Sequence, residues 1–161
     1  MKKIFTTAIT TVLCISAISV VTFAKEIKQD TNPKTANTVI TTSKAVEYTV
    51  IIPESGQAVY GVEDNSIGSV EFMSGNLEPN SKVTVELTNS ADFVNSKDAN
   101  EKIPYSVESN GTTFVKTDFY ENTVAGAKVP LSVKITNSDW ENAKAGNYSA
   151  TLTFTVSYTA Q

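Results

Sequence analysis

The strictest pattern in this 161-residue chain is the alternation of apolar and polar side chains near its C-terminus. From Tyr148 to Tyr158, every even position is apolar or aromatic and every odd position is serine or threonine. Successive side chains of a β-strand point to opposite faces, so this period of two predicts a strand with one buried face. Eleven extended residues would span about 37 Å. We therefore expect a central strand that runs the height of a β-sandwich and contributes to its core.

Shorter segments upstream repeat the pattern. Val129–Thr136 and Ser81–Thr88 alternate clearly. Weaker alternation occurs at Val46–Ile52, Val70–Phe72, Ile103–Val107 and Thr113–Lys116. Residues that favour turns separate these segments, namely Pro53, Gly56, Pro79 with Asn80, Asn110 with Gly111, and Gly126. This organisation predicts an all-β fold, an immunoglobulin-like antiparallel β-sandwich of about seven strands.

One short helical turn is predicted near Trp140, within residues 137–146. Ser138 and Glu141 have capping-box spacing, and Gly146 could close the turn in the left-handed conformation. Trp140 and Ala143 would then share one face. We expect Trp140 to fill one end of the core, and the alternative is an exposed Trp140 that stacks on a sugar ring.

The first 24 residues have the composition of a secretory signal peptide. Lys2 and Lys3 precede an apolar run, and small residues end at Ala24, which predicts cleavage before Lys25. Cys14 would be removed with this segment. Residues 25–44 are polar and predict a flexible N-terminal tether, and residues 45–161 predict the β-sandwich domain. The expected location is secreted, either extracellular or associated with the cell surface.

The composition argues against most catalytic chemistry. The chain has no histidine, all 13 of its basic residues are lysine, and no cysteine follows residue 24. Without Lys2 and Lys3, 11 basic residues remain against 17 acidic ones, a formal charge of −6. Nucleic acid and anionic membranes would repel such a protein. We expect no enzyme activity, no catalytic residue, no metal site and no cofactor.

Three possible functions of the polar side chains have less support in the sequence than a plain role as solvated surface residues. The acidic clusters lack the spacing of a calcium loop, and no pattern places two carboxylates across a glycosidase cleft. A Lys–Asn crosslink needs buried partners, whereas Lys82 and Lys134 alternate outward. The serine and threonine row from Ser149 to Ser157 has no matching rows on other strands, as an ice-binding surface would require.

A family likeness is carried by VPLSVKITNSDWENAKAGNYSATLTFTVSYT (129–159), YTVIIPESG (48–56) and NLEPNSKVTVELTNS (76–90). The chain resembles small exported β-sandwich proteins of Gram-positive bacteria, and its last strand resembles that of fimbrial subunits. The resemblance implies an adhesin-type role at the cell surface and transfers no binding residue. An LPxTG-type sorting signal is missing after Tyr158, so covalent attachment to the wall is not expected.

The leading functional hypothesis is a non-catalytic module for adhesion or surface assembly, with an extracellular protein or glycan as partner. One alternative is a small carbohydrate-binding module, since four aromatic residues lie near predicted loops and could stack on sugars: Tyr60, Tyr105, Tyr120 and Trp140. A second alternative is a strand-exchanging fimbrial-type structural subunit that self-associates when residues near Thr38–Thr42 complete the sheet of a neighbouring copy.

Overall fold

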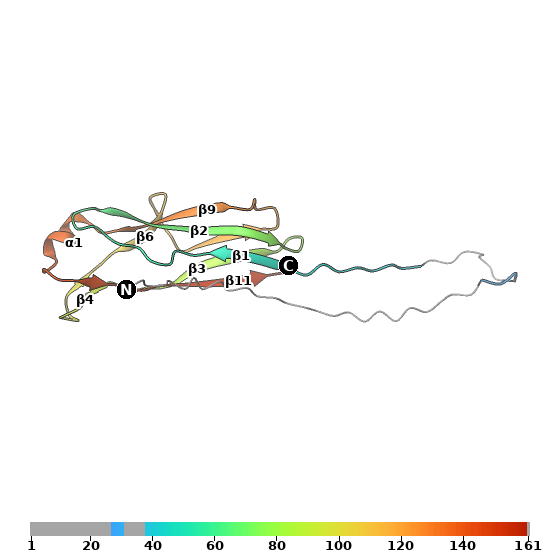
Figure 1. Ribbon diagram of the computed structural model, residues 1–161, viewed down its shortest axis with the longest axis horizontal. Helices are drawn as coiled ribbons and strands as arrows, with labels where there is room; N and C mark the ends of the chain where they lie inside the picture. The colour runs from blue at the N-terminus through green and yellow to red at the C-terminus, as the bar shows by residue number, and fades with distance from the viewer. Residues whose placement is uncertain (1–26, 31–37, 161) are drawn as a thin grey trace, which may run out of the picture.

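Three antiparallel sheets form two facing layers in the computed structural model, which describes residues 27–30 and 38–160 (Figure 1). The predicted signal peptide, its cleavage site and Cys14 lie outside the described residues. The larger sheet has the strand order β1-β2-β9-β6-β7. Its strands are β1 (Glu47–Ile51), β2 (Asp64–Asn76), β6 (Ser106–Ser109), β7 (Thr112–Thr113) and β9 (Ala127–Lys134).

The opposing layer contains two three-stranded sheets. One has the order β11-β3-β8, built from β3 (Lys82–Ser90), β8 (Lys116–Tyr120) and β11 (Leu152–Thr159). The other has the order β10-β4-β5, built from β4 (Phe93–Asn95), β5 (Lys102–Ile103) and β10 (Tyr148–Ser149). The helix α1 (Asn137–Asn142) follows β9 at one end of the molecule (Figure 1). The predicted all-β sandwich with one helical turn near Trp140 is confirmed. The described residues form eleven strands, of which seven have four or more residues.

The core lies between the two layers and is built as the alternation predicts. Val83 and Val85 of β3 are fully buried, and they meet Leu131 of β9 and Val70 of β2 in one apolar cluster. A second cluster nearer α1 contains Ile103, Val133 and Ile135. Most of these side chains come from β2, β3 and β9, which have neighbours on both sides, whereas Ile103 lies on the edge strand β5. Burial of these apolar side chains between the layers stabilises the domain.

The last strand differs from the prediction. The expected continuous strand from Tyr148 to Tyr158 breaks at Ala150 and Thr151 into β10 and β11, which belong to different sheets. β11 is also an edge strand, paired only with β3 among the described strands. Its inward side chains are therefore covered from one side only, and Val156 remains 38% exposed although it faces Val85. The prediction of one continuous, central strand was wrong.

Two of the weaker strand predictions also need correction. The segment Ile103–Val107 divides between β5 and β6, which lie in opposite layers. The segment Thr113–Lys116 is not one strand, because it contains the end of β7, the gap formed by Phe114 and Val115, and the start of β8. At this gap Phe114 is buried, and its backbone N–H donates to the Val107 carbonyl at 2.8 Å, which turns the chain toward the other sheet.

The helix begins earlier than the capping pattern predicts. Thr136, not Ser138, is the N-cap, and its side chain accepts a hydrogen bond from the Asp139 N–H. The helix ends at Ala143 in extended backbone, so Gly146 does not close it in the left-handed conformation. Gly146 instead packs against Asn95, where a Cβ would lie 2.3 Å from the amide nitrogen. Trp140 and Ala143 pack together against the second core cluster, as predicted.

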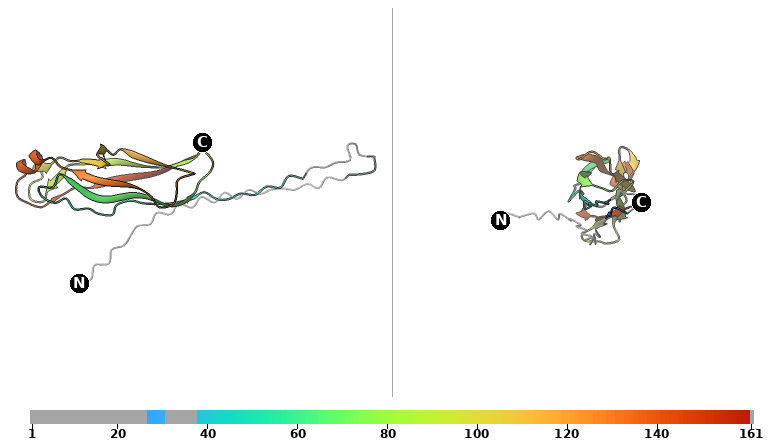
Figure 2. Two further views of the ribbon diagram at one scale, coloured as in Figure 1. Left: turned by 90° about the horizontal axis from the view of Figure 1, so that it is seen from above. Right: turned by 90° about the vertical axis from the view of Figure 1, so that its right-hand side faces the viewer.

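The N-terminal segment leaves the sandwich at the end opposite α1 (Figures 1 and 2). Residues 38–45 are exposed and contain neither helix nor strand. Tyr48 of β1 stacks on Tyr158 of β11, with 6.3 Å between the ring centroids. Because β1 and β11 both end their sheets, this contact places the two edge strands on the same side of the sandwich.

Candidate binding groove at the distal end

Two adjoining hollows form a groove at the α1 end of the molecule, which we call the distal groove. The outer hollow has a volume of about 720 Å³ and the inner hollow about 320 Å³. Gly56, Ala58, Phe93 and Ala150 line both, so the two are continuous. One wall is the segment that follows β1, and the other is formed by β4, β10 and the break before β11. The interruption of the last strand thus helps to open the groove.

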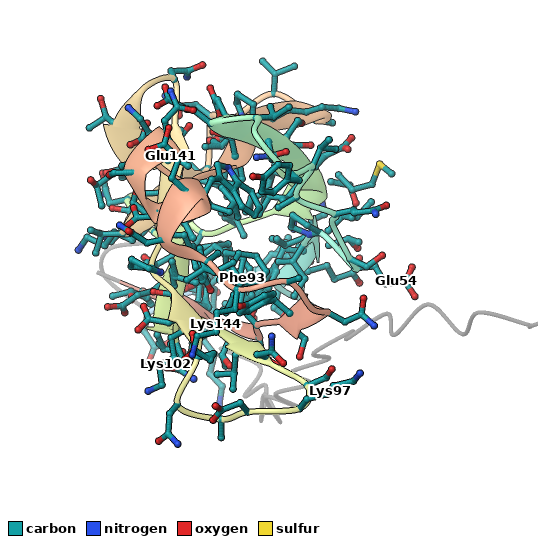
Figure 3. All side chains as sticks on the ribbon, turned by 90° about the vertical axis from the view of Figure 1, so that its left-hand side faces the viewer. Glu54, Phe93, Lys97, Lys102, Glu141 and Lys144 are labelled. Atoms are coloured by element: carbon teal, nitrogen blue, oxygen red, sulfur yellow. The ribbon has the colours of Figure 1, made fainter. Side chains whose placement is uncertain are left out.

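The distal groove lies far from the point where the N-terminal segment joins the domain. Asp64, at the start of β2, pairs with Lys134 just before α1, whereas Asn76, at its end, pairs with Glu47. A strand of this length spans roughly 40 Å. Figure 3 views the distal end directly, with Phe93 near the centre and Glu54 to one side.

The outer hollow has an aromatic rim. The Tyr60 side chain is 76% exposed, and its ring contacts the Trp140 ring edge-on at a centroid distance of 5.5 Å. The Trp140 indole N–H donates to the Val62 carbonyl at 3.0 Å. Trp140 therefore both packs on the core and lines the groove.

A buried asparagine holds the loop that carries Tyr60. The Asn65 side chain accepts a hydrogen bond from the Val59 N–H at 2.7 Å and donates to the Val62 carbonyl at 2.8 Å. Gly61 takes a positive φ of 75°, a conformation that glycine adopts without steric cost. Tyr60 is thus presented by a fixed turn, a suitable arrangement for a binding residue.

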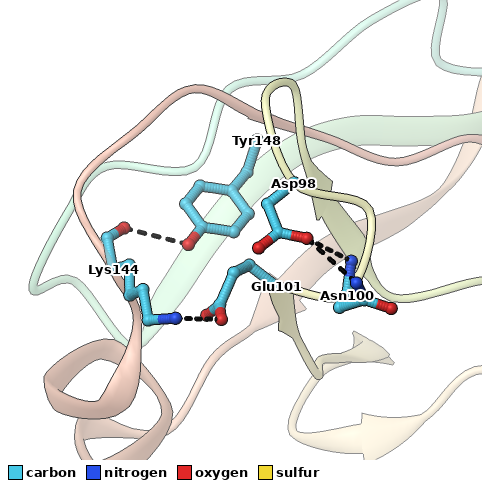
Figure 4. Close-up of polar contacts among 5 residues, drawn as sticks. All are labelled: Asp98, Asn100, Glu101, Lys144 and Tyr148. Atoms are coloured by element: carbon cyan, nitrogen blue, oxygen red, sulfur yellow. Dashed lines mark hydrogen bonds and ion pairs between the residues drawn. The ribbon is translucent and has the colours of Figure 1, made fainter.

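The opposite wall is fixed by polar contacts between the segment that follows α1, β10 and the β4–β5 hairpin. Lys144 forms an ion pair with Glu101, and the Tyr148 hydroxyl donates to the Lys144 carbonyl at 2.9 Å (Figure 4). The Ser96 N–H donates to the Asn147 carbonyl at 2.8 Å. The carboxylate beside Lys144 raises the pKa of that ammonium group, first through the hydrogen bond and then through the charge of Glu101.

The inner hollow is mainly apolar and reaches between the two layers. Its walls include Ile67, Val133, Leu152 and Phe154. Ile67 is the extra residue of a bulge in β2, where the register shifts between Ser66 and Gly68 and Gly68 adopts a φ of 108°. The bulge places Ile67 against both core clusters and in the wall of the groove.

Tyr105 also lines the inner hollow, and its ring packs on Phe93 at a centroid distance of 4.8 Å. Its hydroxyl is buried and has no hydrogen-bond partner among the described residues. Burial raises the pKa of the Tyr105 hydroxyl, and the nearby charge of Asp92 raises it further. The group therefore stays protonated at neutral pH, able to donate a hydrogen bond.

The structure brings together three of the four aromatic residues singled out in the sequence. Tyr60 and Trp140 line the outer hollow and Tyr105 the inner one. Tyr120 lies elsewhere, because it ends β8 opposite Lys82, at the end of the sandwich where Tyr158 stacks on Tyr48 of β1. Phe93, shared by both hollows, was missed because the three-residue strand that carries it is too short to show a period.

Two kinds of feature are absent from the part of the chain that the structure describes. Residues 27–30 and 38–160 contain no group of three or more acidic, histidine or cysteine side chains placed to hold a metal ion. Within the same ranges, no helix is long and apolar enough to cross a bilayer. The chain matches no protein-family model and no curated protein.

Proposed function

We propose that the protein is an extracellular, non-catalytic module for adhesion or surface assembly and that it holds its partner in the distal groove. The single observation that carries this proposal is the position of the groove. A hollow of about 720 Å³ with an aromatic rim opens at the end farthest from the N-terminal segment. A partner bound in the groove would be well separated from any molecule or surface to which the N-terminal segment is attached.

The chemistry of the groove favours recognition. Pockets of this size that combine apolar walls with a few placed polar groups are the usual sites of ligand binding. The rim residue Tyr60 offers a large amphipathic surface on a loop that Asn65 keeps in place. Rigid aromatic residues of this kind contribute strongly to binding because little conformational freedom is lost.

The test uses two exposed tyrosines at opposite ends of the molecule. Tyr60 is 76% exposed in the groove rim, and Tyr120 is 48% exposed far from it. We would screen the protein on arrays of matrix proteins and glycans, then measure the affinity of Tyr60→Ala and Tyr120→Ala for the ligand found. Tyr60→Ala should bind about tenfold more weakly, while Tyr120→Ala should bind like the unsubstituted protein. Equal affinities of the unsubstituted protein, Tyr60→Ala and Tyr120→Ala for the ligand would refute binding in the distal groove.

The second candidate is a carbohydrate-binding module, and the Tyr60–Trp140 pair favours it. The apolar face of a sugar ring stacks on aromatic side chains, and sugar hydroxyls bind polar groups at the edge of the same site. The outer hollow supplies both, since Gln57, Asn147 and Ser149 line it beside the two aromatic rings. This candidate predicts that glycans, not matrix proteins, give the positive signals on the arrays.

A further inference from the structure

The edge strand β11 lacks the features that protect the other sheet edges. Proteins keep open edges from pairing with other chains by charged residues, by proline or by short edge strands. Among the described edge strands, β5, β7 and β10 have only two residues each, β1 carries Glu47, and β8 carries Lys116 and Asp118. β11 extends over eight residues and contains neither a charged residue nor proline. It is therefore the edge most open to another strand in the described part of the chain.

The free side of β11 leaves apolar surface uncovered. Within the described residues, β11 pairs only with β3, and none of its residues is buried. Val156 lies in the middle of the strand and is 38% exposed, although its partner on β3, Val85, is completely buried. The register shift with β3 lies near the start of the strand, between Thr153 and Phe154, and the remainder is regular. A strand placed alongside β11 would cover Val156 and extend the ladder of backbone hydrogen bonds.

The sequence of β11 is nearly symmetrical about Val156. In either direction from this residue the chain has a hydroxyl side chain, an aromatic ring and a threonine. If two copies of β11 lay antiparallel with Val156 opposite Val156, every side chain would meet one of its own kind. The pairs would be Val156 with Val156, Thr155 with Ser157, Phe154 with Tyr158, and Thr153 with Thr159. Aromatic pairs and pairs of hydroxyl side chains stabilise antiparallel strands, so β11 is complementary to itself.

We propose that β11 is a self-association edge, through which two copies of the protein pair antiparallel about a two-fold axis at Val156. The two three-stranded sheets then form one sheet with the strand order β8-β3-β11-β11-β3-β8. The association closes at two copies, because pairing uses β11 of both and the outer strand β8 carries Lys116 and Asp118. The distal groove takes no part in this contact, so the inference does not depend on the proposed ligand.

Antiparallel pairing fixes how the two molecules are oriented. β11 begins at Leu152, in the wall of the inner hollow, and ends beside the Tyr48–Tyr158 contact, at the end from which the N-terminal segment leaves (Figure 2). In the dimer, the two distal grooves therefore lie at opposite ends, and so do the two N-terminal segments. Copies attached through these segments to two different surfaces would be oriented to pair, whereas neighbours on one surface would not. The contact thus suits adhesion between two surfaces that display the protein.

The contact between two copies should be weak. Edge-to-edge pairing joins the rims of two sheets and not their faces, so we expect it to bury less than the roughly 1,200 Å² of a stable interface. The protein is then a monomer at the micromolar concentrations of size-exclusion chromatography and a dimer at millimolar concentration. Many such contacts acting together would still hold two surfaces to each other.

Sedimentation equilibrium from micromolar to millimolar concentration tests the proposal. The unsubstituted protein should pass from monomer to dimer, and deletion of residues 25–44 should not change the dissociation constant. Val156→Lys should weaken the association at least tenfold, because two ammonium groups would meet at the axis. An equimolar mixture of Val156→Lys and Val156→Glu should associate at least as tightly as the unsubstituted protein, because opposite charges then face each other. Val124→Lys is the matched control, since Val124 is 77% exposed in the turn between β8 and β9.

Thermal unfolding followed by circular dichroism shows whether each variant keeps its fold. If Val156→Lys does not fold, Thr155→Lys gives the same test, because Thr155 is exposed on the outer face of β11. A protein that stays monomeric at every concentration refutes the proposal. So does a folded lysine variant that associates like the unsubstituted protein, or a dimer that is lost on deletion of residues 25–44, since either result places the contact elsewhere. A mixture of folded Val156→Lys and Val156→Glu that fails to associate would refute antiparallel pairing about Val156.

Discussion

Replacing Asp118 by asparagine should destabilise the sandwich measurably at neutral pH and hardly at all in acid. The Asp118 carboxylate on β8 accepts a hydrogen bond from the Thr84 hydroxyl at 2.6 Å and from the Lys82 ammonium at 2.8 Å. Its side chain is 18% exposed, and Thr84 is buried. The contact joins β3, which supplies Val83 and Val85 to the core, to β8, which supplies Phe119.

The size of the effect follows from these contacts. A hydrogen bond to a charged group contributes about 1.5–3 kcal/mol, and a neutral one about 1 kcal/mol. The partly exposed ion pair adds little because solvent screens it. We therefore expect Asp118→Asn to lower the free energy of unfolding by about 1.5 kcal/mol, which corresponds to roughly 6 °C in melting temperature for a domain of this size.

The pH dependence has a definite sign. The hydrogen bonds from Lys82 and then from Thr84 hold the pKa of the Asp118 carboxyl below its ordinary value of 3.8. The stability that this carboxylate contributes is thus fully present above that value and is lost as the pH falls through it toward the lower folded-state pKa. The melting curves of the two proteins should converge over that range.

Thermal unfolding followed by circular dichroism between pH 7 and pH 2 would measure both effects. Glu121→Gln is the control, because Glu121 is exposed and makes no hydrogen bond or ion pair within the described residues. Equal stability of Asp118→Asn and the unsubstituted protein at pH 7, or a difference that persists undiminished at pH 2, would refute the reasoning.

Three further predictions concern the groove and the N-terminal segment. Trp140→Ala should lower the free energy of unfolding by about 2 kcal/mol, measured by urea denaturation, since it leaves a cavity beside the second core cluster; an unchanged midpoint would show that Trp140 does not support the core. Gly56→Ala should weaken binding of the ligand found on the arrays, because its Cβ would lie 2.6 Å from Ile67 Cγ2 and displace the groove wall; an unchanged affinity by calorimetry would contradict this. The protein should elute as a monomer in size-exclusion chromatography both with residues 25–44 and after their deletion. Oligomers that disappear on deletion would instead favour strand exchange through Thr38–Thr42.

The fold was predictable where strands lie in the middle of a sheet. β3 and β9 each have neighbours on both sides, so their inward valines and Leu131 are buried as the alternation indicated. The period of two reports only which face a side chain points to, not whether another strand lies alongside. β11 shows the limit, because it alternates almost perfectly and yet occupies a sheet edge.

The groove was only partly predictable for a related reason. Tyr60 and Trp140 were found because aromatic residues near loops are uncommon and useful for binding. Their contact depends on the Trp140–Val62 hydrogen bond and the turn at Asn65, which join positions about 80 residues apart. No local pattern indicates the sheet change at Ala150 or the bulge at Ile67, and these two features open the inner hollow.

The most direct test of the account is whether a ligand binds at the distal groove. Trp140 is the only tryptophan in the chain, so its indole N–H gives a single, readily assigned signal in a ¹H–¹⁵N correlation spectrum. Titration with the ligand selected on the arrays should shift that signal together with the backbone amides of residues 54–60 and 147–151. If the shifts appear instead around Lys82 and Tyr120, with the Trp140 signal unmoved, the distal groove is not the binding site.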